Sequence, residues 1–258
     1  IIVIPVNGII SSYGSMGDSM VTQVKKQLKF AKDDSRVKAV LLNIDSPGGE
    51  VLASDEIARA IREFQKETGK PVIAAMGGMA ASGGYYIAAP CKYIIANELT
   101  ITGSIGVIMQ SVNVRGLMDK VGVEPITFTS GRNKAMLDPF NSPEKVTDEQ
   151  KKILQDFIDG TYDKFVAVVK KGRDKAARGN GSEAKALAKD WQDYADGRIL
   201  TGEDALKHGM VDANGNFDDA IKFAEKIVNI SEGDARLVRN DPPVTFGGLF
   251  RLLGKAEE

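Results

Sequence analysis

The stretch Met79-Ala80-Ala81-Ser82-Gly83-Gly84-Tyr85-Tyr86-Ile87-Ala88 joins a strand-like run to an apolar, helix-like run. The preceding residues, Pro71 to Met76, have the continuous apolar character of a buried strand. A serine at the start of a helix has its hydroxyl beside backbone N–H groups that lack helical partners, and such groups can bind an oxyanion. Ser82 is therefore a candidate nucleophile, with an ordinary turn serine that caps a helix as the alternative.

The order of strand, glycine turn and helix also occurs upstream. A strand-like run, Val37 to Ile44, enters the turn Asp45-Ser46-Pro47-Gly48-Gly49, and a helix is predicted over 51–66. Repetition of this unit favours an α/β fold with a mainly parallel sheet and functional groups at the carboxyl ends of its strands. The periodicity predicts further strands at 1–10, 92–97 and 124–129, and helices at 19–31 (with Met20, Val24, Leu28 and Phe30 near one face), 114–120, 147–171, 201–208 and 218–227.

Composition limits the classes of function. A chain of 258 residues with 43% hydrophobic and 27% charged residues suits one large soluble domain, or a domain with an appendage. The net charge of -1, without a basic patch, argues against a nucleic-acid partner. Cys91 is the only cysteine, so an internal disulfide is excluded. We see no metal-ligand cluster and expect neither a metal nor an organic cofactor.

A serine nucleophile needs a base. The only histidine, His208, precedes Gly209 at the predicted end of a short helix, where a capping role fits better. The other candidates are lysines held neutral by burial. Lys134 follows a predicted strand and a Ser-Gly turn, whereas most of the other lysines lie on polar helix faces; a surface lysine is the alternative. Ser104 lies in a glycine-flanked turn, where a serine without chemistry is the alternative.

Four motifs, which are listed below in their order along the chain, resemble the signal peptide peptidase A (protease IV) family. The resemblance runs from residue 1 to about 227 and does not cover the tail after 231. It implies a Clp protease/crotonase-like spiral of ββα units with an added helical arm. The motifs are Asp45-Ser46-Pro47-Gly48-Gly49, Ala81-Ser82-Gly83-Gly84-Tyr85-Tyr86, Thr102-Gly103-Ser104-Ile105-Gly106-Val107 and Ser130-Gly131-Arg132-Asn133-Lys134.

The resemblance also implies a Ser-Lys dyad mechanism without a cofactor. In it, Ser82 is the nucleophile, Lys134 the general base and Ser104 a hydroxyl that orients the lysine. The backbone N–H groups of Gly49 and Gly83 form the oxyanion hole. The implied substrates are extended, hydrophobic peptides, such as released signal peptides, with small residues near the cut.

The resemblance further implies homo-oligomeric rings in which serine and lysine come from neighbouring subunits. The members of that family carry an N-terminal membrane anchor, and their catalytic domain lies outside the cytoplasm at the cell membrane. This chain has no apolar run near the ~20 residues that span a bilayer. Because it starts at Ile1 within a strand-like run, without an initiator methionine, we expect a preceding segment in the full-length protein.

We predict a ββα-spiral catalytic core over 1–140, a helical arm over 141–195, a return to the core over 196–230 and a tail over 231–258. The tail could be mobile, dock on the protein or touch a membrane surface. Two rival functions remain at this level. One is a crotonase-like acyl-CoA enzyme, and the other is a non-catalytic oligomeric scaffold of the same fold.

Overall fold

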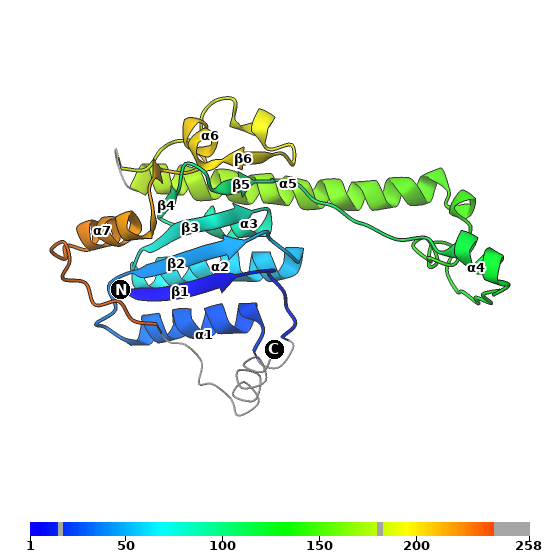
Figure 1. Cartoon of the computed structure of the whole chain (residues 1–258), viewed down its shortest axis with the longest axis horizontal. Coiled ribbons are helices and arrows are strands. Elements are labelled where there is room, and N and C mark those ends of the chain that lie inside the picture. Colours follow the sequence, from blue (N-terminus) through cyan, green and yellow to red (C-terminus); the bar gives the residue numbers. More distant parts are fainter. Residues whose placement is uncertain (15–17, 180–182, 240–258) are drawn as a thin grey trace, which may run out of the picture. The chain divides into compact units, whose positions relative to one another are not determined.

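The computed structural model describes residues 1–14, 18–179 and 183–239 (Figure 1). Helices alternate with strands that lie mostly parallel in one sheet, so the predicted α/β class is confirmed. Consecutive side chains of strands 2–7 and 40–46, which point to opposite faces of the sheet, are buried, since Ile2, Val3, Val40 and Leu41 are all 0–1% exposed. Burial on both faces requires helices on both sides of the sheet.

The chain divides into two compact units. The core unit comprises residues 1–105 and those described from 168 onward, and the arm unit comprises residues 106–167. These bounds differ from the predicted division, which placed the end of the first core segment at 140. We describe each unit by itself.

The strand β3 connects two parts of the sheet. Among the described residues, five strands are parallel in the order β1-β2-β3-β4-β7. β3 pairs with β4 through its first half and with β5 through its last three residues, so Gly77 and Gly78 lie between the two pairings. β6 pairs with β5 in the antiparallel direction. The strands are β1 (Ile2–Asn7), β2 (Val40–Ser46), β3 (Val72–Ala81), β4 (Tyr93–Ala96), β5 (Ile101–Gly103), β6 (Ile199–Thr201) and β7 (Ala213–Asn214).

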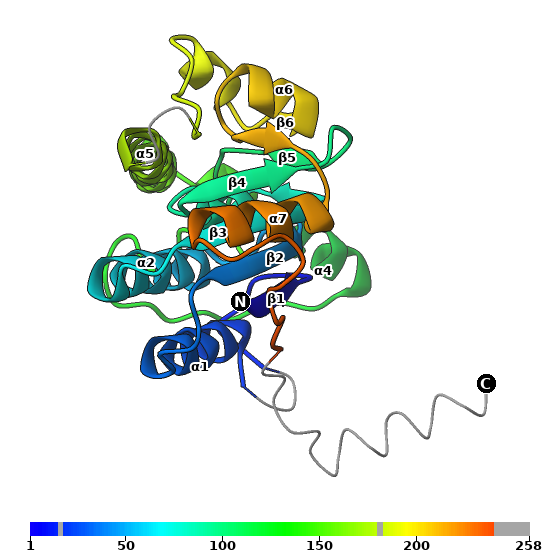
Figure 2. The ribbon, with the colours of Figure 1, turned by 90° about the vertical axis from the view of Figure 1, so that its left-hand side faces the viewer.

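Helices cover the sheet of the core unit. α7 packs on the face that carries Val3, Leu41 and Ile73, and its Phe223 ring stacks on Tyr93 at 3.6 Å. α1 and α2 lie side by side (Figure 2) and are joined by two ion pairs. The helices are α1 (Met20–Asp33), α2 (Val51–Thr68), α3 (Gly83–Ala88), α4 (Arg115–Val121), α5 (Asp148–Gly179), α6 (Gly202–Lys207) and α7 (Phe217–Ile227).

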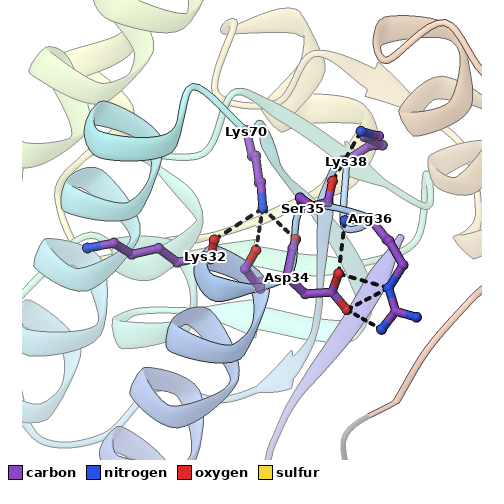
Figure 3. A network of polar contacts seen from close by, with 7 residues as sticks. Lys32, Asp34, Ser35, Arg36, Lys38 and Lys70 are labelled. Carbon is purple, nitrogen blue, oxygen red and sulfur yellow. Dashed lines mark hydrogen bonds and ion pairs between the residues drawn. The ribbon is translucent and has the colours of Figure 1, made fainter.

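Lys70 stabilises the carboxyl end of α1 (Figure 3). Its ammonium donates to the carbonyl oxygens of Ala31 at 2.6 Å and Asp34 at 2.9 Å. A cation at this position satisfies carbonyls without helical partners and interacts favourably with the helix dipole. Beside it, hydrogen bonds from Arg36 lower the pKa of Asp34 to about 2. The network therefore has a structural role.

The long helix α5 is capped as predicted. Thr147 Oγ1 accepts the Gln150 N–H at 3.2 Å, and Gln150 Oε1 accepts the Thr147 N–H at 3.2 Å. The helix ends at Gly179, eight residues beyond the predicted 171. Near that end, Arg173 forms an ion pair with Asp212, and both side chains are 0% exposed. Partnered burial of this kind fixes the last turns of α5 in the core unit.

Two local predictions were wrong. Residues 124–129 form no strand, and Ile126 and Phe128 there are 81% and 92% exposed. A strand needs a hydrogen-bonded neighbour, and none of the described residues supplies one at this position. Phe30, expected on the inner face of α1, is 37% exposed, whereas Val24 and Leu28 are buried. Phe30 lies two residues from Leu28, about 200° around the helix.

The described part of the tail docks on β1. Val3 N–H donates to Val238 O, and Val238 N–H donates to Ile1 O, each at 2.9 Å. The buried Glu225 carboxylate accepts the N–H groups of Gly233 and Ala235. Residues 240–258, which include the apolar run at 242–253, lie outside the described residues.

Candidate active site

Ser82 occupies a strained position between β3 and α3. Its φ of 50° and ψ of -120° lie in a region that residues other than glycine rarely adopt. The surrounding hydrogen bonds hold it there, because Ser82 N–H donates to Gly103 O at 2.9 Å and Ser82 O accepts from Tyr86 N–H at 2.8 Å. The side chain makes no capping hydrogen bond to α3, so the helix-cap alternative is not supported. Strain of this kind is typical of catalytic residues on strand-to-helix turns.

The glycine turn after β2 contacts the Ser82 turn directly. A Cβ atom on Gly48 would lie 2.6 Å from the Gly83 nitrogen and 2.9 Å from Ser82 Cβ. A Cβ atom on Gly83 would lie 3.2 Å from the Gly49 nitrogen. The two backbones therefore approach so closely that only glycine fits at Gly48 without displacement.

The N–H groups of Gly49 and Gly83 lie close together at this contact. Among the described residues, neither donates a hydrogen bond. Two N–H groups beside a serine hydroxyl can stabilise the oxyanion that forms when the serine attacks a carbonyl carbon. The structure thus brings together Ser82, Gly83 and Gly49, which the sequence places in two separate motifs.

Ser104 directly follows β5, the strand that pairs with the end of β3. β3 and β5 pair so that Ala81 is opposite Gly103, and Ser82 and Ser104 therefore follow paired residues. Ser104 has a φ of 51°, and its N–H donates to Arg198 O at 2.7 Å. Among the described residues other than glycine, only Ser82, Ser104 and Asn229 have a positive φ. Two of the three are thus predicted site residues.

Lys134 lies in the arm unit and is exposed there. Its N–H donates to Gly131 O at 3.1 Å, which closes a turn. The start of α5 holds this turn, because Gln150 Nε2 contacts Asn133 Oδ1 at 3.3 Å and Arg132 pairs with Glu149 at 2.6 Å. The single chain therefore does not supply the burial expected for a neutral lysine.

His208 has the structural position that the sequence predicts. It is the C-cap residue of α6, and its ring stacks on Tyr194 with centroids 3.6 Å apart. Its Nδ1 lies 3.4 Å from Asp190 Oδ1. These contacts account for the side chain without a catalytic role.

Several supporting residues were missed by sequence reasoning. Ser54 Oγ lies 2.5 Å from the position that a Cβ on Gly83 would occupy, and it donates to Glu50 O at 2.9 Å. Asp45 Oδ1 accepts the Met79 N–H at 3.0 Å, next to the glycines of β3. Only Asp45 lies within a motif noted in the sequence. Ser54 is a helix residue whose role depends on a contact between separate segments.

The site residues form no metal centre. Within residues 1–14, 18–179 and 183–239, no group of three or more His, Cys, Asp or Glu side chains could hold a metal ion. A cleft of about 230 Å³ lies elsewhere in the core unit, between Lys70, Lys92 and the end of α5. Lys92 donates there to Gly179 O at 2.8 Å. Burial raises the pKa of the adjacent Cys91 to about 12, which disfavours the reactive thiolate.

The strained serine and its facing glycine turn define a hydrolase site on a Clp-like α/β fold. The family model described as Peptidase family S49 matches residues 64–231, and the Clp protease model matches residues 4–98. The chain belongs to peptidase family S49 and is a serine peptidase. The predicted family, fold class and enzyme class are therefore confirmed.

Curated relatives support this assignment. The chain is 36% identical over 250 residues to a protein of Enterococcus faecium described as a candidate signal peptide peptidase SppA, covering 93% of this chain and 67% of that protein. It is 39% identical to Protease 4 of Haemophilus influenzae, covering 80% of this chain and 31% of that protein. It is 35% identical to the chloroplastic serine protease SPPA of Arabidopsis thaliana, covering 87% and 31%.

Solved structures agree on the fold. Two variants of the 1510-N membrane-bound stomatin-specific protease match with TM-scores of 0.51 and 0.54, at 19% and 18% identity. The matches cover 93% and 99% of this chain, and 97% and 96% of those chains. At this level of sequence identity, the two matches support only the fold, that is, the arrangement of helices and strands.

Proposed function

We propose that this serine peptidase is an endopeptidase with a Ser-Lys dyad. Ser82 is the nucleophile, Lys134 the general base and Ser104 the hydroxyl that orients the lysine. Gly49 and Gly83 supply the oxyanion hole. The observation that carries the proposal is the strained Ser82, whose side chain does not cap α3, beside two N–H groups for which the described residues supply no acceptor.

The reaction follows from these roles. Neutral Lys134 takes the proton of the Ser82 hydroxyl, and the Ser82 oxygen attacks the peptide carbonyl carbon. The negative charge on the carbonyl oxygen is stabilised by the two glycine N–H groups. The lysine then protonates the leaving amine as the C–N bond breaks. Water attacks the resulting acyl-enzyme and restores the serine.

Hydrophobic peptides are the proposed substrates, including released signal peptides. The relative from Enterococcus faecium carries the name signal peptide peptidase, which indicates this class. Apolar side chains beside the glycine turn are also exposed: Val51 is 52% and Leu52 64% exposed. An apolar substrate segment would cover such side chains on binding.

The proposed active form is a ring-like homo-oligomer whose sites combine Ser82 of one subunit with Lys134 of the next. Two observations support it. Lys134 is exposed on the arm unit, although a neutral lysine needs a low-dielectric environment. The arm unit also exposes many large apolar side chains, which are typical of a protein interface. They include Ile108, Val112, Leu117, Val121, Ile126 and Phe128.

We further propose that the full-length protein acts at the cell membrane, anchored there, with its catalytic domain outside the cytoplasm. Support comes from the name of the Enterococcus faecium relative, which is described as a candidate signal peptide peptidase. In the described parts of the chain, no helix has the length and apolar character of a membrane span.

A fluorophosphonate probe tests the nucleophile. We expect it to label the wild-type protein at Ser82 and to block hydrolysis of an apolar peptide. Ser82→Ala should lose both labelling and hydrolysis. Ser35→Ala, at an exposed serine after α1, should keep both. Labelling of a different residue in the wild type would contradict the assignment.

A further inference from the structure

Glu50 begins α2 without capping it. The residue is the N-cap of the helix, yet its side chain makes no capping hydrogen bond. Both carboxylate oxygens bind the segment after β1 instead: Oε1 accepts from Ser11 Oγ at 2.8 Å, and Oε2 accepts from Ser12 N–H at 2.9 Å. A helix-terminal acceptor that serves a distant segment needs an explanation other than capping.

The segment that Glu50 binds also supports the glycine turn. Ile10 N–H donates to Gly48 O, and Glu50 N–H donates to Ile10 O, each at 2.9 Å. A Cβ on Gly49 would lie 2.0 Å from Ile10 O, so the two backbones are in direct contact. Ile10 therefore lies on one side of the turn, while Ser82 and Gly83 lie on the other.

The turn needs such support because it contains two adjacent glycines. Glycine has the widest choice of backbone conformations, so a Gly-Gly turn does not fix the direction of its own N–H groups. An oxyanion hole is effective only if its donors already point to the position of the developing charge. Something outside the turn must therefore hold it.

We propose that Glu50 is a positioning residue for the oxyanion hole: its carboxylate holds Ser11 and Ser12, and through Ile10 it fixes the Gly49 N–H. The proposal rests on the proposed role of Gly49. The Glu50 carboxylate binds Ser11 and Ser12 rather than Ser82, so it acts through them. The Ser12 N–H, and then the Ser11 hydroxyl, lower the pKa of Glu50, so the carboxylate keeps both acceptors at neutral pH.

The test compares two ligands of the same peptide sequence. A peptide aldehyde adds its carbonyl carbon to Ser82 Oγ, and the resulting hemiacetal oxygen occupies the oxyanion hole. The corresponding peptide alcohol has the same side chains but no carbonyl at that position, so it forms no such adduct. A defect in the hole weakens the aldehyde alone, whereas a general loss of folding weakens both ligands.

For Glu50→Ala we expect kcat and aldehyde affinity to fall by a similar factor, about tenfold or more, with KM and alcohol affinity nearly unchanged. Ser11→Ala, which removes one donor to the carboxylate, should show a smaller fall of the same pattern. Glu56→Gln is the matched control, because Glu56 lies on the same helix and pairs with Lys25. It should leave all four quantities unchanged.

Equal losses of aldehyde and alcohol affinity would overturn the proposal, and so would an unchanged kcat. If Glu50→Ala does not fold, Ser11→Ala and Glu50→Gln answer the same question. The quantity to compare is again the loss of aldehyde affinity relative to the loss of alcohol affinity. If Ser82 is not the nucleophile, the proposed function itself fails and the result is different. The Ser82→Ala variant would then still form the aldehyde adduct, which mass spectrometry detects.

Discussion

Ser82 and Ser104 are joined through one backbone hydrogen bond, from the Ser82 N–H to the carbonyl oxygen of Gly103, the residue before Ser104. Each serine has a positive φ, of 50° and 51° respectively. The two turns are thus fixed relative to each other by main-chain contacts, and substitution of either side chain leaves this bond in place.

Replacement of the nucleophile should separate stability from activity. Both Ser82→Ala and Ser82→Gly should lose hydrolysis, since neither has a hydroxyl. Glycine adopts a φ of 50° without steric cost, so Ser82→Gly should be more stable than Ser82→Ala by about 1 kcal/mol. Urea unfolding measures the difference. If Ser82→Gly were the less stable variant, the strain at this position would be disproved.

The glycine turn should tolerate no side chain at Gly48. The added methyl group of Gly48→Ala would meet the Gly83 nitrogen and Ser82 Cβ. We expect at least a tenfold loss of kcat, on the order of the effect of a misplaced catalytic group, and a lower melting temperature. Gly116→Ala, on α4, has open space around the new methyl group and should behave as the wild type. Full activity of Gly48→Ala would contradict the close approach of the two turns.

The base role of Lys134 predicts a dependence on pH. Because the lysine must lose its proton to accept another, hydrolysis should increase from neutral to alkaline pH. Lys134→Arg should be as inactive as Lys134→Ala, since guanidinium stays protonated. Initial rates from pH 6 to 10 measure this. An active Lys134→Arg enzyme would refute the assignment.

Subunit mixing tests the composite site. Inactive Ser82→Ala and Lys134→Ala subunits, dissociated and reassembled together, should recover part of the activity. Some interfaces then pair an intact serine with an intact lysine from its neighbour. Exchange of subunits, checked by mass labels, without recovered hydrolysis would show that the dyad forms within one chain.

The sequence predicts local structure best where one segment determines it. The apolar run before Ser82, the glycines after it and the cap at Thr147 each act within a few residues, and all were predicted. The strand expected at 124–129 was wrong, because strand formation requires a partner that local patterns do not show.

Local sequence patterns could not predict the contacts that support the site. Ser11 is 39 positions from Glu50, and nothing near either residue indicates the other. The motifs indicated Gly49 and Gly83 as a pair only through the family resemblance. Their proximity depends on β2 and β3 being neighbours in the sheet.

The contact of Val238 with β1 has a consequence for synthesis of the protein. The backbone groups of Ile1 and Val3 that bond Val238 have no such partner until Val238 has left the ribosome. During that time, β1 presents an open edge to which another nascent chain could attach. Pairing of Val238 with the start of β1 is thus a late event, and it occupies only the first residues of that edge.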